Sequence, residues 1–232
     1  MNAMATEYYR NLCERFENLR EAFLPEEFSP TGEYADIVYE HTRAYKVLTH
    51  AELEYYFEEV AKAIAQKALR EWRSSNQVSK PLLALVAYYP GAFEPLPELS
   101  TGNHVQMDLE QRISTSFTAY FSYVNSENHG IKEKNLIHLF LPIGIRIDEL
   151  PHDLLISANN YGSMRGAIAH STRAQQMLQP EEVKRAADEI LGNVALLDGL
   201  LEPYLLPPAE TAGDRRRGRV RNRRGRLRRP AA

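Results

Sequence analysis

Hydrophobic residues recur at spacings of three and four along most of the chain, which is typical of helices that bury one face. The first such pattern covers residues 4–24, with its repeating positions at Tyr8, Leu12, Phe16, Leu19 and Phe23. The stretch "PEEFSPTGEY" then interrupts it with two prolines and a glycine. Residues 33–72 contain neither glycine nor proline and continue the apolar spacing, so they predict a second, much longer helix.

Residues 74–103 break this helical pattern. Pro81, Pro90, Pro95 and Pro97 crowd a segment with one short apolar run, "LLALVAYY". Periodicity does not decide whether so short a run is a strand-like stretch or a packed loop. We interpret the segment as a proline-rich insertion between helices.

The second half of the chain returns to helical spacing. It predicts a helix over residues 105–126, a turn at "NHG", and a short helix from Lys132 to about Leu141. Pro151 suits the first turn of the next helix, and Pro180 opens a last helix expected to end before Pro203. The predicted fold is therefore all-α, an up-and-down helical bundle.

Charge divides the chain into two parts. Residues 214–232 hold ten arginines and one aspartate and carry +9, so a net charge of −3 leaves −12 on the remaining residues. We expect a helical domain over residues 1–206 and a disordered arginine-rich tail over 207–232. Such a tail either binds RNA through its phosphates or folds back on the acidic body.

Other features of the composition favour a soluble cytoplasmic protein. The chain has a single cysteine, Cys13, which excludes an internal disulfide framework. Its N-terminus lacks a basic segment followed by an apolar one, and its longest apolar run is too short to span a bilayer. The seven histidines are dispersed, with no two at four-residue spacing, so we expect neither a metal nor another cofactor.

The stretch "YGSMRGAIAHSTR", residues 161–173, carries the candidate chemistry. On a helix, Arg165 falls in the middle of the apolar stripe formed by Leu154, Ala158, Tyr161 and Ile168. A buried guanidinium needs an anionic partner, which Glu52 or Glu54 on the long helix would supply as a structural ion pair. The alternative is that Arg165 serves an anionic substrate.

Small residues lie on an adjoining face of the same helix, at Gly162, Gly166 and Ala169. Each glycine costs roughly 1 kcal/mol relative to alanine in a helix interior. Either these residues allow close packing inside the bundle, or they accept a second subunit or RNA. His170 lies beside this face and diverges from Arg165 by about 140° on a straight helix, so a two-fold pairing of helices would be needed to bring the two residue types together.

Three blocks of the chain resemble one protein family. "RAYKVLTHAELEYYFEE", "NHGIKEKNLIHLFLPIGI" and "RGAIAHS" occur in the order found in the HEPN superfamily, and they look most like its RiboL-PSP-HEPN branch. The last block contains the family's R-x4-H motif at Arg165 and His170. Many active members carry a polar residue directly after the arginine, where this chain has Gly166.

The resemblance implies a homodimer in which paired motifs form a metal-independent endoribonuclease site. His170 would act as general acid or base and Arg165 would hold the scissile phosphate, with Glu52, Glu54 and Ser171 as supporting candidates. The function it implies is that of a toxin or defence effector acting on RNA, with an antitoxin protein as a possible partner and no membrane. The alternatives are a non-catalytic HEPN module that binds RNA, a nucleotide or a protein, and a plain helical adaptor.

The chemistry suits these residue types. RNA supplies its own nucleophile, the 2′-hydroxyl, so the protein must provide proton transfer and charge stabilisation. A histidine titrates near neutrality, and an arginine fork fits a phosphate. Asn128 and His129, in the second block, are expected to form a helix-entry turn rather than to bind substrate.

Overall fold

Helices make up the regular structure of the described residues. The computed structural model describes residues 5–89, 109–170 and 177–206, and for residues 164–170 it describes the helical backbone alone. The α-helices are α1 (Glu7–Phe23), α2 (Asp36–Ser75), α3 (Lys80–Tyr88), α4 (Leu109–Ser126), α5 (Glu133–Phe140), α6 (His152–His170) and α7 (Pro180–Leu205). Two short 3-10 helices, η2 (Leu141–Ile143) and η3 (Ile147–Glu149), connect α5 to α6. No strand occurs within the described ranges, which confirms the predicted all-α class.

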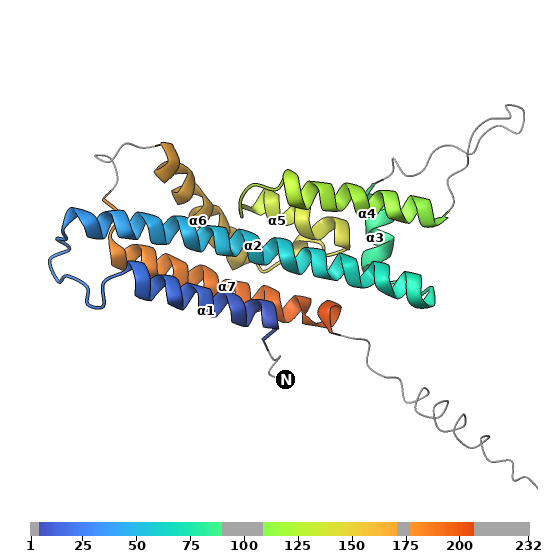
Figure 1. Ribbon diagram of the computed structural model, residues 1–232, viewed down its shortest axis with the longest axis horizontal. Coiled ribbons are helices and arrows are strands. Elements are labelled where there is room, and N and C mark those ends of the chain that lie inside the picture. The colour runs from blue at the N-terminus through green and yellow to red at the C-terminus, as the bar shows by residue number, and fades with distance from the viewer. Residues whose placement is uncertain (1–4, 90–108, 171–176, 207–232) are drawn as a thin grey trace, which may run out of the picture.

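The long helix α2 is the axis of the fold, and the other elements pack around it (Figure 1). Helices α1 and α7 lie along one side of α2, while α3, α4 and α5 lie on the other. Helix α6 packs against α7, α2 and α5, and its C-terminal end turns away from the long axis of the bundle. The end of α6, which carries the R-x4-H motif, is therefore placed at the edge of the bundle.

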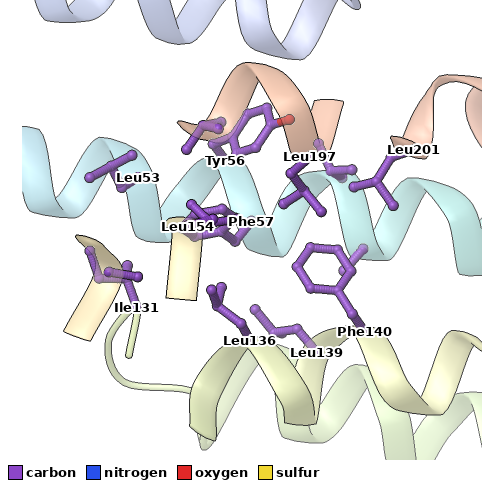
Figure 2. Close-up of a cluster of buried hydrophobic side chains, with 14 of the residues drawn as sticks. Leu53, Tyr56, Phe57, Ile131, Leu136, Leu139, Phe140, Leu154, Leu197 and Leu201 are labelled. Atoms are coloured by element: carbon purple, nitrogen blue, oxygen red, sulfur yellow. The ribbon is translucent and has the colours of Figure 1, made fainter. Parts of the chain in front are cut away.

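A single hydrophobic core runs through the bundle, and α2 contributes to it along most of its length. Figure 2 shows its central part, where side chains from α2 meet those of α5, α6 and α7. The labelled side chains are all buried: Leu53, Tyr56, Phe57, Ile131, Leu136, Leu139, Phe140, Leu154, Leu197 and Leu201. Helices from both sides of α2 thus share one core, which holds the base of α6 in place.

One buried carboxylate joins α1, α2 and α7. Asp198 on α7 is only 2% exposed, and it accepts hydrogen bonds from the backbone N–H of Thr6 at 2.8 Å and from the Tyr56 hydroxyl at 2.9 Å. The Thr6 hydroxyl donates a third hydrogen bond to Asp198, and it also caps α1 by accepting from the N–H of Tyr9. Asp198 therefore fixes the start of α1 against the other two helices.

The structure corrects the interpretation of residues 74–103 as an insertion with a strand-like stretch or packed loop. Residues 80–88 form helix α3, which begins after the cap Ser79 and has Pro81 in its first turn. Leu82 and Leu85, one turn apart, are buried in the core. Residues 90–103, with the other three prolines, lie outside the described residues.

Helix α7 also differs from its predicted end. It continues through Pro203 to Leu205, because a proline in the last turn removes a single hydrogen bond to the preceding turn. Residues 207–232, the predicted tail, lie outside the described residues. A search of the described helices finds none that is both long and apolar enough to cross a membrane.

Candidate functional site

Helix α6 carries the two motif residues, and its first half is firmly seated in the bundle. Leu154, Ala158 and Tyr161 are at most 1% exposed, as the apolar stripe predicts. Arg165 and His170 both lie on the helical backbone, which ends at His170. Their side chains lie outside the description, and so does all of Ser171. Arg165 follows Tyr161 by one helical turn, so the motif begins directly above the buried part of the helix.

The turn between α4 and α5 holds α6 through backbone and side-chain contacts. Asn159 on α6 accepts a hydrogen bond from the N–H of Glu133 at 3.0 Å and donates one to the Glu133 carboxylate at 3.2 Å. A Cβ atom at Gly162 would lie 3.0 Å from Cγ of Lys132 and 3.6 Å from Cγ1 of Ile131. Gly162 therefore serves close packing inside the bundle, which is the first of the two alternatives that the sequence leaves open for the small residues.

Polar side chains from α2 fix the same turn. Glu54 accepts a hydrogen bond from the N–H of Gly130 at 2.6 Å, and Glu58 accepts one from the side chain of Asn128 at 2.8 Å. Asn128 in turn accepts from the Asn135 amide at 3.2 Å. Burial raises the pKa of the Glu58 carboxyl, and the hydrogen bond from Asn128 opposes that rise. Asn128 is buried and holds the turn together, as the sequence analysis expects.

Glu52 and Glu54, the two acids expected to pair with Arg165, both have other partners. Glu52 forms an ion pair with Arg15 on α1, with its carboxylate 2.8 Å from the guanidinium, and so faces α1. Glu54 lies 3.7 Å from Nδ1 of His50 in addition to its bond with Gly130. Glu54 supports the turn against which Gly162 packs, so it acts on α6 through that turn.

Lys46 on α2 is the most unusual group near the motif helix. Its side chain is fully buried, and its ammonium nitrogen has no hydrogen-bond partner within the described part of the chain. The nitrogen lies 2.5 Å from the centroid of the Tyr161 ring on α6. Burial alone lowers the pKa of Lys46 from its usual 10.5 to about 6, so the amine is neutral at pH 7 and makes an N–H···π contact with the ring.

Thr49, one turn beyond Lys46, completes the contact between α2 and α6. Its hydroxyl is 2.6 Å from the hydroxyl of Tyr161, and both groups are buried. Burial raises the pKa of the Tyr161 hydroxyl, which stays protonated. The base of the motif helix thus rests on a neutral lysine and a pair of bonded hydroxyl groups.

The sequence does not single out Lys46, because a lysine on a long helix is ordinarily exposed. The position of Lys46 relative to the apolar residues of α2 does indicate that it is buried. Lys46 lies three residues before Thr49 and seven before Leu53, two positions on the buried side of α2. A charged residue within a buried helical stripe is the same pattern that singled out Arg165.

The spacing of the motif limits what one subunit can do. Five residues of helix separate Arg165 from His170 by about 140° around the axis and about 7.5 Å along it. A single straight helix therefore presents these residues in different directions. The homodimer expected from the sequence would pair two copies of α6 about a two-fold axis, so that the arginine of one copy faces the histidine of the other.

The described residues hold no group of three or more histidine, cysteine, aspartate or glutamate side chains that is placed to bind a metal ion. Comparison of the chain with models of known families, with curated proteins and with solved structures gives no match in any of the three cases.

Proposed function

We propose that the protein is a metal-independent endoribonuclease of the HEPN type and acts as a homodimer. The observation that carries this proposal is the position of Arg165 and His170, five residues apart in the C-terminal part of a helix whose base is fixed in the core. Arginine is suited to bind a phosphodiester, and histidine is suited to transfer protons near neutral pH.

The reaction needs only groups that the RNA and these two side chains supply. The RNA 2′-oxygen attacks the adjacent phosphorus while His170 removes its proton, forming the 2′-O–P bond. The P–O5′ bond then breaks, and the 5′-oxygen takes up a proton from a histidine acting as general acid. The products are a 2′,3′-cyclic phosphate and a free 5′-hydroxyl. Arg165 stabilises the extra negative charge on the phosphate oxygens in the transition state.

One feature of the helix supports this proposal. The helical divergence of the motif residues favours a composite site made by two subunits, each of which contributes one copy of α6.

Proton transfer of this kind contributes typically 10²–10⁴-fold to a rate, which suits an enzyme that needs few turnovers. We therefore place the protein among toxins or defence effectors, with an antitoxin protein as its cognate inhibitor.

The test is cleavage of single-stranded RNA by the purified chain in EDTA, followed by analysis of the product ends. The proposal predicts that cleavage persists and leaves 2′,3′-cyclic phosphate ends. Activity that disappears on chelation and returns with a divalent ion would contradict the mechanism.

An Arg165→Ala variant separates the two interpretations of the arginine. Loss of cleavage with unchanged unfolding supports a role in substrate binding, whereas a large loss of stability supports a structural ion pair.

A further inference from the structure

Away from α6, an open hollow of about 480 Å³ lies between α3, α4 and α5. Tyr88 and Tyr89 line it from the end of α3, Tyr123 and Glu127 from the end of α4, and His138 from α5. Four of these five side chains are aromatic rings. Nothing in the nuclease proposal uses this surface, and the inference drawn from it is independent of that proposal.

The rings are held in place by contacts with one another. Tyr88 and Tyr89 meet edge to face, with ring centroids 5.2 Å apart, and Tyr123 meets His138 in the same way at 5.6 Å. The Tyr123 hydroxyl also lies 3.2 Å from Nδ1 of His138. Rings fixed in this way keep aromatic surface available to a ligand at little further cost in side-chain entropy.

The charge of the hollow selects the class of ligand. Glu127 is exposed and contributes a carboxylate, and the lining contains neither lysine nor arginine. Burial raises the pKa of the Tyr123 hydroxyl, and the nearby carboxylates of Glu127 and Glu58 raise it further. Burial, with smaller contributions from neighbouring groups that include Glu127, raises the pKa of Tyr89 to about 12. A negative, aromatic hollow favours a cation that stacks on rings and repels a phosphate.

The chain itself contains such cations near its C-terminal end. Residues 215–229 hold ten arginines, and the rest of the chain is strongly acidic. The last turn of α7 lies against the start of α3, where Tyr204 and Lys80 line one pocket. Helix α3 spans only about 13 Å, and the eight residues from 207 to 214 can extend to about 26 Å. The arginines are therefore within reach of Tyr88, Tyr89 and Tyr123.

We propose that arginine side chains of residues 215–229 bind in this hollow of the same chain, with a guanidinium stacked on the tyrosines and paired with Glu127. Arginine suits this hollow better than lysine does, because its planar group stacks on a ring and bonds a carboxylate through two N–H groups at once. Because the segment is tethered, its effective concentration at the hollow is in the millimolar range, so weak individual contacts suffice to hold it there.

The test uses the full chain with Cys13→Ala and Asn222→Cys, so that a spin label can be attached within the arginine segment alone. The aromatic NMR signals of Tyr88, Tyr89 and Tyr123 are expected to broaden. Tyr55, an exposed tyrosine that lines a different pocket with α1, is the internal control and should stay sharp. Broadening of all four signals alike, or of none of the three in the hollow, would overturn the proposal.

Two variants of this labelled chain identify the interaction. Glu127→Gln removes the exposed carboxylate without disturbing the core, and it should weaken the broadening. Replacing all ten arginines by lysine keeps the charge of +9, and it should also weaken the broadening because the stacking fork is lost. If the lysine tail broadens the signals as strongly as the arginine tail, general charge attraction explains the contact and the proposed site is wrong.

Added RNA distinguishes the remaining alternative. The proposal predicts that single-stranded RNA withdraws the arginine segment from the hollow and restores the sharp signals of the three tyrosines. If RNA instead shifts those signals in a chain whose ten arginines are replaced by glutamine, the hollow binds RNA directly, and its assignment to the arginine segment is overturned.

Discussion

Two buried ionisable groups, Asp198 and Lys46, have opposite surroundings. Asp198 is almost fully buried, yet it accepts hydrogen bonds from the Thr6 backbone, the Thr6 hydroxyl and the Tyr56 hydroxyl. Lys46 is also fully buried, but its nitrogen has no hydrogen-bond partner within the part of the chain that the structure describes. The first group joins α1, α2 and α7, whereas the second lies beneath α6.

The difference shows that Asp198 stabilises the fold, whereas burial of Lys46 lowers the stability of the fold. A buried charge with several hydrogen bonds strengthens the contact it makes, and its loss is expensive. A buried amine without a hydrogen-bond acceptor lowers stability, and such costs concentrate at functional sites. The contrast therefore places the structural centre of the molecule between α1, α2 and α7, and the unsatisfied group beneath α6, the helix of the proposed ribonuclease motif.

The largest expected effect comes from removing the satisfied group. Asp198→Ala leaves the Thr6 N–H and the buried Tyr56 hydroxyl without this acceptor, and we expect the free energy of unfolding to fall by about 3–5 kcal/mol. Asp188→Ala, an exposed site on the same helix, is the control and should change it by no more than about 0.5 kcal/mol. Urea unfolding followed by circular dichroism measures both, and equal effects would show that the Asp198 cluster has no special role.

Lys46→Met should have the opposite sign. Between the folded pKa of about 6 and the usual value of 10.5, the unfolded chain binds one more proton than the folded chain, so the lysine lowers stability. At pH 7 we expect the methionine variant to be more stable than the wild type by up to about 4 kcal/mol.

The pH dependence of Lys46→Met provides its own check. The gain should be greatest below pH 6, where the penalty of the buried charge is complete, and it should shrink as the pH rises toward 10.5. Unfolding measured at several pH values tests this sign. A methionine variant less stable than the wild type at pH 7 would show that the amine makes a favourable contact, and the contrast with Asp198 would fail.

A smaller effect distinguishes the two glycines of α6. Gly162→Leu places a side chain against Lys132 and Ile131, and we expect it to destabilise the monomer by about 1–3 kcal/mol. Gly166→Leu should leave the monomer helical and weaken dimerisation and RNA cleavage together. Sedimentation combined with thermal unfolding separates the two outcomes. A Gly166→Leu chain that dimerises and cleaves RNA normally would contradict the two-fold pairing of α6.

Much of the fold could be predicted from the sequence, because the spacing of apolar residues within each segment indicates a helix. α2 lacks glycine and proline over its whole length, and its apolar positions keep a regular spacing. α3 could not be predicted, because an eight-residue apolar run fits several structures and its leucines become buried only through contacts with other helices. The end of α7 was also predicted wrongly at Pro203. In the sequence, a proline tolerated in the last turn of a helix cannot be told from one that ends the helix.

The site was less predictable than the fold, because its contacts join segments far apart in the chain. The motif and the apolar stripe of α6 are local patterns and could be read directly. The partners of Glu52 and Glu54 could not, since Arg15 comes from α1 and Gly130 from the turn before α5. The burial of Lys46 beneath Tyr161 depends on the crossing of α2 and α6.

The most direct test of the central claim is single-turnover RNA cleavage by His170→Ala beside the wild type, with the unfolding of both proteins measured in parallel. Loss of the general acid–base should slow cleavage by about 10²–10⁴-fold. The unfolding transition should stay unchanged, because His170 is the last residue of α6 and lies beyond its buried first half. Cleavage by a folded His170→Ala protein at the wild-type rate would contradict the claim that α6 carries a ribonuclease site.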